Sequence, residues 1–332
     1  MDTKTLGIIA NIIGTLLLVG QATSIKYIEI DIFWIIFINL FAYSVVPLIM
    51  MIIDQYLISG KKYAYSKAFT DIKLYPAPIS DLIKRAMAIV AYINLPMAII
   101  MPIEGLIPSF VVIFSYLIMK EDINYKQIIG IALSFLGLII LNIKNFTNIE
   151  KGFDGKMVYA IIAGIIFVIL HSFNFIYMKK YVKESDNQNT NAVEQLYYNN
   201  AIPFVLMCVM FLGTYLLKSK YSMCKDIVNF PKNNFGLMVK SFLITFVLFG
   251  VTQNILYFWS DTVLNGPIFG SLFSLQVIVG VMAGYIFFNE KINVYTVVGS
   301  LIVIAGIIAV TYYSKKDKDD KDDKDEYRFN RL

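Results

Sequence analysis

The stretch EKINVYTVVGSLIVIAG at residues 290–306 is the strongest indication of the fold of this chain, because it has a counterpart earlier in the sequence. The counterpart is EDINYKQIIGIALSFLG at residues 121–137, at an offset of 169 residues. Each copy lies between two apolar runs, so each predicts a helical hairpin with a short polar turn. Two such hairpins indicate an internal duplication. In membrane proteins, duplicated halves are typical of transporters whose site lies between the repeats.

The composition is that of a polytopic membrane protein. The chain has 332 residues, of which 58% are hydrophobic, and its mean hydropathy is +0.65. Soluble domains are usually about 45–50% apolar, and a helix needs roughly 20 apolar residues to cross a bilayer. We therefore predict an all-α fold of ten transmembrane helices in two inverted five-helix repeats. The predicted spans are residues 6–24, 32–53, 84–100, 103–119, 126–143, 157–178, 196–217, 239–259, 267–288 and 294–313.

The predicted domains are two halves, residues 1–150 and 151–314, and a charged tail, residues 315–332. The tail has almost no apolar content and is expected to be disordered and cytosolic. Lys and Arg number 19 on the side of the N-terminus and 10 on the other side. This bias predicts that both termini are cytosolic, although without the tail the count is 12 against 10.

Several classes of function leave no signature in this sequence. We find no cluster of metal ligands, no nucleophile–base arrangement and no phosphate-cradling glycine loop, so no enzyme, metal or cofactor is expected. Cys208 and Cys224 are too few for a disulfide framework. The net charge of +5 is spread over loops and tail, which indicates orientation in the membrane and not nucleic-acid binding. The expected partners are the lipid bilayer and a small-molecule substrate. The repeated glycines could support either a homodimer or contacts within the chain.

The paired hairpins resemble those of the drug/metabolite transporter superfamily, and the resemblance extends over nearly all of the chain to residue 313. It implies a bundle of ten helices around a central cavity, with alternating access. It also implies that Glu121 and Glu290 anchor helix ends and loops, while the glycines of both copies are close-packing positions. A carboxylate at a helix C-terminus opposes the helix dipole, so we expect another group to hold it.

A short motif at residues 197–200 resembles the aromatic-Tyr-Asn-Asn motif of nucleotide-sugar transporters. The resemblance implies that Asn199 and Asn200 read a nucleobase, because an amide both donates and accepts hydrogen bonds. Tyr197 and Tyr198 would form the walls of that site. It further implies an endomembrane location, most often the Golgi, with another organelle or the plasma membrane as alternatives. The residues alone also allow an interfacial aromatic belt with helix-end asparagines.

A second motif of that family, Gly-Ala-Leu-Asn-Lys, is not intact here. The nearest stretch is residues 270–276, in which Ser274 stands where the lysine would be. Because a phosphorylated substrate needs cationic compensation, this change weakens the case for substrates that carry phosphate. Polar residues of the eighth and ninth spans are predicted to line the opposite wall of the site: Ser271, Ser274, Gln276, Asn254 and Tyr257.

Ionisable residues inside predicted spans are functional candidates. His171, the only histidine, lies in the middle of the sixth span and could couple proton movement to transport. The alternative is a neutral ring bonded to a neighbouring helix. Glu104, at the start of the fourth span, could face the cavity and bind a cation or proton, or mark the interface. Lys84 and Arg85 begin the predicted third span and are interpreted as cytosolic anchors, with attraction of phosphate as the alternative.

Three functions fit these observations. The first is a secondary antiporter of nucleotide sugars or organic phosphates. The second is a proton-coupled transporter of a drug, amino acid or other small metabolite, in which His171 and Glu104 would matter. The third is a membrane scaffold that does not transport. A positively charged lining of the cavity favours the first, a neutral or acidic lining the second, and an apolar centre the third.

Overall fold

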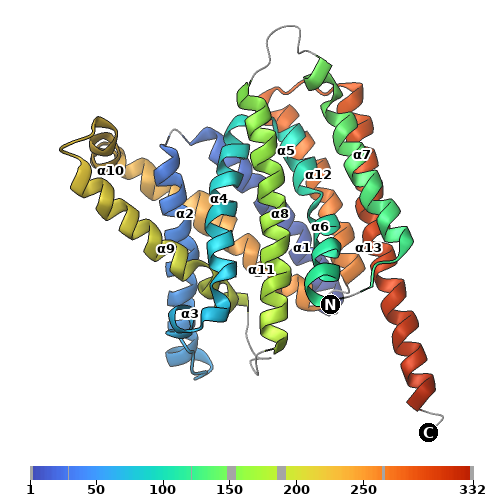
Figure 1. Cartoon of the computed structure of the whole chain (residues 1–332). Coiled ribbons are helices and arrows are strands. Elements are labelled where there is room, and N and C mark those ends of the chain that lie inside the picture. Colours follow the sequence, from blue (N-terminus) through green and yellow to red (C-terminus); the bar gives the residue numbers. More distant parts are fainter. Residues whose placement is uncertain are drawn as a thin grey trace.

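The computed structural model describes residues 3–28, 30–120, 122–147, 155–184, 192–263 and 266–329, which form a bundle of helices (Figure 1). The elements of the first half are α1 (Thr3–Tyr27), α2 (Ile32–Ile53), η1 (Asp54–Ile58), α3 (Lys67–Thr70), η2 (Ile72–Leu74), α4 (Pro76–Asn94), α5 (Met97–Glu104), α6 (Ile107–Phe114), η3 (Ser115–Met119) and α7 (Tyr125–Thr147). Those of the second half are α8 (Gly155–Glu184), α9 (Ala192–Leu217), α10 (Ser222–Lys240), η5 (Ser241–Val251), α11 (Thr252–Val263), α12 (Gly266–Phe288) and α13 (Val294–Phe329).

The lengths of these helices match a chain that crosses the membrane many times. Within the described ranges, seven helical stretches are long and apolar enough to span a bilayer. They are Thr5–Tyr27, Ile32–Ile58, Met97–Met119, Gly155–Met178, Val193–Leu217, Cys224–Tyr257 and Val294–Tyr313. The remaining predicted spans correspond to α4, α7 and α12. The prediction of an all-α polytopic membrane protein is thus confirmed, and each predicted span has a helix.

The boundary between the third and fourth spans was predicted wrongly. The third helix, α4, already begins at Pro76, where a proline at the first helical position needs no hydrogen-bonded N–H. It ends at Asn94, and the following residue, Leu95, has an extended ψ of 145° because the next residue is Pro96. The predicted boundary at residues 100–103 also fails at Pro102, since α5 continues through this residue to Glu104.

The duplicated stretch folds in the same way in both halves. The residue before each glutamate, Lys120 or Asn289, has a left-handed φ of 59° or 51°, which ends the preceding helix. The asparagine of each copy then starts the next helix. The Asn124 side chain accepts a hydrogen bond at 3.0 Å from the backbone two residues on, and the Asn293 side chain accepts one at 3.0 Å from the backbone three residues on. The sequence repeat is therefore also a repeat of backbone conformation.

The repeated spacing of glycines brings the last helices of the two halves, α7 and α13, side by side (Figure 1). A Cβ atom added at Gly137 would lie 2.7 Å from the carbonyl oxygen of Gly299, and one added at Gly130 would lie 3.0 Å from that of Gly306. The first glycine of each copy thus meets the second glycine of the other, as in a two-fold symmetric, antiparallel pair. The predicted close packing is confirmed, and the glycines of the two copies make these contacts within one chain.

The glutamate of the second copy ties the two halves together. One oxygen of Glu290 accepts the N–H of Met97 at 2.7 Å and the other accepts that of Ala98 at 3.0 Å, at the start of α5. The Nζ of Lys26, at the end of α1, lies 3.3 Å from the same carboxylate. The expected anchor role of Glu290 is confirmed. Its counterpart Glu121 lies outside the described residues.

A second set of contacts joins the halves near the C-terminal end of α2, at the opposite end of the bundle from Glu290. Here the segment after η1 meets the end of α8 and the start of α9. Lys61 Nζ lies 3.1 Å from Glu194 Oε2, and the Tyr181 hydroxyl donates to Asp71 Oδ2 at 2.6 Å. The bundle is therefore tied at both of its ends, with its polar interior between them.

Candidate functional site

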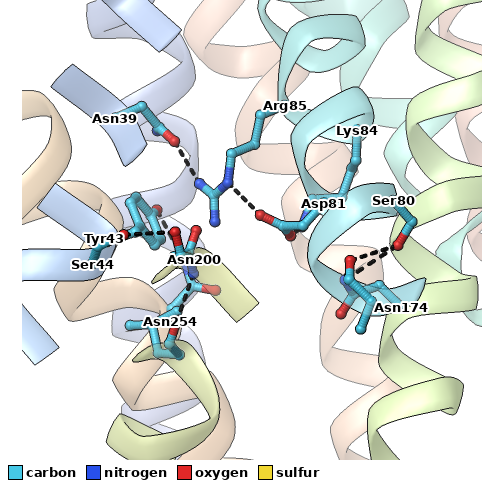
Figure 2. Close-up of polar contacts among 12 residues, drawn as sticks. Asn39, Tyr43, Ser44, Ser80, Asp81, Lys84, Arg85, Asn174, Asn200 and Asn254 are labelled. Atoms are coloured by element: carbon cyan, nitrogen blue, oxygen red, sulfur yellow. Dashed lines mark hydrogen bonds and ion pairs between the residues drawn. The ribbon is translucent and has the colours of Figure 1, made fainter. Parts of the chain in front are cut away.

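A compact ionic cluster lies on one face of α4. Asp81, Lys84 and Arg85 are three and four residues apart, so their side chains share that face. Lys84 donates to one oxygen of Asp81, and the Nε of Arg85 donates to the other at 2.5 Å (Figure 2). Asp81 is only 2% exposed. Two cations surround one carboxylate, so the cluster carries a net charge of +1.

Arg85 extends this cluster to neighbouring helices. Its Nη1 donates to Asn39 Oδ1 of α2 at 2.5 Å, and its guanidinium carbon lies 4.2 Å from the centre of the Tyr43 ring. The Tyr43 hydroxyl in turn accepts from Gln21 of α1 at 3.4 Å and from Asn254 of α11 at 3.0 Å. Arg85 and Tyr43 therefore connect helices of the first half to α11 of the second half (Figure 2).

The two asparagines of the predicted nucleobase motif lie on α9 beside this network. The backbone oxygen of Asn200 accepts from Ser44 of α2 at 2.8 Å, and its Nδ2 donates to the Leu196 carbonyl at 2.7 Å. The Oδ1 atoms of Asn199 and Asn200 are buried and accept no hydrogen bond from the part of the chain that the structure describes. A buried acceptor without a donor is costly, so each of these atoms could accept one from a ligand or water.

The two tyrosines of the same motif turn in another direction. The hydroxyl of Tyr197 donates to the carbonyl of Tyr65 at 3.5 Å. The hydroxyl of Tyr198 lies 3.4 Å from the carbonyl of Ala64 and donates to Glu194 at 2.9 Å. Both rings therefore pack beneath the segment that follows η1. Their role as walls of a nucleobase site stays a prediction.

Glu104 and His171 occupy different surroundings. Glu104 is 1% exposed, and its carboxylate accepts the hydroxyl hydrogen of Tyr92 from α4. His171 of α8 packs edge-on against Phe167, with ring centres 5.8 Å apart. It is close enough to the α4 cluster to interact electrostatically with Lys84. His171 and Glu104 are thus not brought into contact with each other.

The predicted opposite wall is partly described. Asn254 joins the network at Tyr43, and the Tyr257 hydroxyl lies 3.0 Å from that of Thr15 on α1. Gln276 is fully buried on α12, and neither of its amide atoms has a partner among the residues that are described. The side chains of Ser271 and Ser274 lie outside the described part of the structure.

Sequence reasoning missed the centre of this network. Lys84 and Arg85 are not cytosolic anchors, because α4 begins at Pro76 and places them more than two turns inside the helix. Their side chains are 14% and 11% exposed. The signal that could have found them is the spacing of Asp81 from the two cations, which is that of a helical ion-pair cluster. Asn39 and Tyr43, in an apolar stretch of α2, carried no such signal.

Comparison with known proteins agrees with this architecture. Residues 158–312 match the EamA-like transporter family. The S-adenosylmethionine uptake transporter of Rickettsia prowazekii (strain Madrid E) is 24% identical over 212 residues, which are 63% of this chain. The aligned part spans 61% of that relative's length. A solved structure, described as "Crystal structure of protein", shares the fold with a TM-score of 0.56 at 11% identity, over 94% of this chain and 99% of its own.

The family match covers the second half of the chain. The duplicated hairpins and the antiparallel pairing of α7 with α13 agree with a transporter built from two related halves. The relative and the shared fold extend the similarity beyond the second half. The chain is a multi-pass integral membrane protein, and its similarity to the EamA-like transporter family and to the uptake transporter supports a place in the drug/metabolite transporter superfamily.

Proposed function

We propose that this chain is a secondary transporter that moves a small zwitterionic organic solute by alternating access between its two halves. S-adenosylmethionine is the first substrate to test. The observation that carries the proposal is the position of Arg85, held by Asp81 and Asn39 above the Tyr43 ring, where helices of both halves meet. The proposal also draws on the similarity to a relative whose name gives S-adenosylmethionine uptake as its function.

Arg85 is suited to bind a carboxylate. A guanidinium has five N–H donors in a fixed fork, which matches the two oxygens of a carboxylate. Asp81 and Asn39 accept two of these donors and thereby fix the orientation of the plane. The donors that remain, together with the net charge of +1 in the cluster, favour an anionic group at this point. The unsatisfied Oδ1 atoms of Asn199 and Asn200 can accept the exocyclic N–H groups of a purine.

A second candidate is the antiport of nucleotide sugars or other organic phosphates. The observation that favours it is the burial of Lys84 together with Arg85. These two interior cations could offset the charge of a phosphate, which the uncharged Ser274 cannot do. The third interpretation, a scaffold without transport, is disfavoured by the same observation. Buried charges are expensive in a membrane and are usually retained for function.

We further propose that both termini are cytosolic, as the distribution of Lys and Arg predicts. The Golgi or another endomembrane as the location, and a homodimer as the assembly, stay predictions.

The experiment is ligand binding by the purified full-length protein, followed by exchange in proteoliposomes. A panel should contain S-adenosylmethionine, S-adenosylhomocysteine, methionine, a nucleoside monophosphate, its nucleotide sugar and a sugar phosphate. A ligand that binds the folded state raises its thermal stability. We expect stabilisation by S-adenosylmethionine and its exchange across the bilayer, both lost in Arg85→Gln and both kept in Lys291→Gln, a change at an exposed turn.

Two outcomes would decide against the proposal. Stabilisation by the nucleotide sugar or sugar phosphate alone, lost in Arg85→Gln and in Lys84→Gln, would establish the second candidate. Binding of S-adenosylmethionine that is unchanged in Arg85→Gln would show that the site lies elsewhere in the bundle.

A further inference from the structure

Apart from the α4 cluster lies a buried carboxylate that has no cation beside it among the described residues. Glu104 is 1% exposed, and its hydrogen-bond partner is the hydroxyl of Tyr92, which is itself 7% exposed. The ion pairs formed by the described residues involve Asp81, Glu194 and Glu290 but not Glu104. A charge in the interior of a membrane protein is strongly disfavoured without a partner. Glu104 must therefore either carry a proton or meet a cation.

The groups that face Glu104 are aromatic and not basic. On α4 the facing group is Tyr92, and Tyr257 of α11 lies within electrostatic range of the same carboxylate. α8 also packs on α5, but its histidine, His171, contacts the ring of Phe167. α12, α7 and α13 also touch α5. The described side chains of α12, residues 275–288, include no charged group, and those of α13, residues 294–313, include none either. On α7 the charged residues Lys126 and Lys144 lie near its two ends.

These tyrosines also connect Glu104 to the proposed site of the carboxylate. Tyr92 lies within electrostatic range of Tyr43, over whose ring the guanidinium of Arg85 is placed. The interior thus has a cation at Arg85, which contacts the ring of Tyr43, and a carboxyl group at Glu104, which is bonded to Tyr92. Such rings attract organic cations through their electron-rich faces. A solute with a carboxylate at one end and an ammonium or sulfonium group nearby is complementary to this arrangement.

We propose that Glu104, with the rings of Tyr92 and Tyr257, forms the subsite for the cationic group of the transported solute, and that one proton takes the place of that group when the solute is absent. This inference rests on the transporter function proposed above and adds the chemistry of its second subsite. When the cation enters, the O–H bond of the Glu104 carboxyl breaks, the electron pair stays on the oxygen and the proton passes to water. Solute cation and proton then compete for one carboxylate, so they move in opposite directions across the membrane.

The first test measures the proton without any assumption about the substrate. Infrared difference spectra of the ligand-free protein, recorded as the pH is changed, report the C=O stretch of a protonated carboxyl. We expect such a band in the wild type, its loss in Glu104→Gln and its shift in Tyr92→Phe, which removes the hydrogen bond. Glu194→Gln, a change to a carboxylate that is paired with Lys61, should leave the band in place. A band that persists in Glu104→Gln would overturn the inference.

The second test compares two ligands that differ by one methyl group and one positive charge. S-adenosylmethionine carries a sulfonium, whereas S-adenosylhomocysteine has a neutral thioether. Titration calorimetry in buffers of different ionisation enthalpy counts the protons released on binding. We expect the binding of S-adenosylmethionine to release about one proton. We also expect it to bind about tenfold or more tightly than S-adenosylhomocysteine, because its sulfonium gains cation–π and ionic contacts in a desolvated site. Glu104→Gln should abolish both the release and the preference.

The outcomes separate the subsite from the substrate. If neither adenosyl compound binds but tetramethylammonium displaces the proton in the wild type and not in Glu104→Gln, the subsite stands and the proposed substrate fails. If S-adenosylmethionine binds and exchanges but Glu104→Gln keeps both the charge preference and the proton release, the transporter proposal stands and this inference fails.

Discussion

The Nζ of Lys26 lies 3.3 Å from the carboxylate of Glu290, and this ion pair joins the end of α1 to the turn between α12 and α13. The same carboxylate accepts two backbone N–H groups at the start of α5. A carboxylate just beyond the C-terminus of its own helix interacts unfavourably with the dipole of that helix. At the N-terminus of α5, however, it accepts hydrogen bonds from free N–H groups and lies at the positive end of the dipole of α5. The glutamate of the repeated stretch thus stabilises a helix of the other half.

Replacing this carboxylate should weaken one end of the bundle. In Glu290→Ala, the N–H groups of Met97 and Ala98 lose their acceptor and Lys26 loses its counter-ion. We expect the free energy of unfolding to fall by about 2 kcal/mol or more, because hydrogen bonds to charged groups contribute about 1.5–3 kcal/mol each. The measurement is denaturant unfolding of the purified protein. Lys291→Ala, next to it but exposed, is the matched control and should change the unfolding free energy little.

The same variant tests whether this clamp moves during transport. Because α1 and α5 belong to the first half and the turn to the second, the clamp must open if that end opens. We expect Glu290→Ala to increase the labelling of Ala98→Cys by a water-soluble thiol reagent, in a background without Cys208 and Cys224. Equal labelling with and without Glu290 would show that the clamp is a fixed structural cap.

Close packing of α7 on α13 predicts an unusual effect of alanine. In an exposed helix Gly→Ala is stabilising by up to about 1 kcal/mol. At Gly137, however, the new Cβ would lie 2.6 Å from the backbone N of Val303, so the helices must move apart. We expect Gly137→Ala to lower the unfolding free energy by about 1–3 kcal/mol, as overpacking does. At Gly213 a new Cβ would meet no described atom within 4 Å outside its own helix backbone, so Gly213→Ala should be neutral or stabilising.

Much of this fold could be predicted from the repeat, for a physical reason. A duplicated hairpin carries its caps, its turn and its glycine spacing together, and each of these has a local sequence signal. The N-caps at Asn124 and Asn293 and the contact of Gly137 with Gly299 follow directly from that pattern. The prolines gave a weaker signal. Whether Pro96 or Pro102 ends a helix depends on the local backbone and not on residue type alone.

The candidate site was harder to predict, because its key side chains come from segments with different local patterns. The sequence predicts Arg85 as a cytosolic anchor because it places the start of the third span too late. Asn39 and Tyr43 lie in an apolar helix and acquire meaning only when Arg85 packs on them. The asparagine motif at residues 199–200 lies on α9, which contacts α2 through Ser44 and Asn200, and its role in binding stays a prediction. Its neighbouring tyrosines pack under a loop instead, which no periodicity could have indicated.

The cluster on α4 should be sensitive to the loss of its carboxylate. In Asp81→Asn, Lys84 and Arg85 remain buried next to each other without a counter-ion. Breaking a buried ion pair by removing one partner costs about 3–5 kcal/mol, so we expect a loss of this size in unfolding free energy. The double variant Asp81→Asn, Lys84→Met removes one of the unpaired cations and should recover a large part of that loss. A double variant that is no more stable than the single one would show that Lys84 is not repelled by Arg85 at this position.

The contact between Tyr181 and Asp71, beyond the end of the spanning part of α8, predicts a pH dependence. Burial of the ring, followed by the hydrogen bond to Asp71 and the charge of that carboxylate, raises the pKa of Tyr181 above its ordinary value of 10.0. The folded pKa is higher than the unfolded one, so the stabilising contribution is complete below about pH 10 and is lost as the pH rises through the folded pKa.

The measurement is the ultraviolet absorbance of tyrosinate, recorded for the wild type minus Tyr181→Phe. It should show that Tyr181 ionises at a higher pH than an unperturbed tyrosine. In Asp71→Asn the ionisation should move to lower pH, because the charge that opposes tyrosinate is gone. Tyr159→Phe, a change at a ring that is exposed to 60%, is the control and should leave the Tyr181 step in place. A Tyr181 step at the same pH with and without the Asp71 charge would mean that this contact does not form in the folded protein.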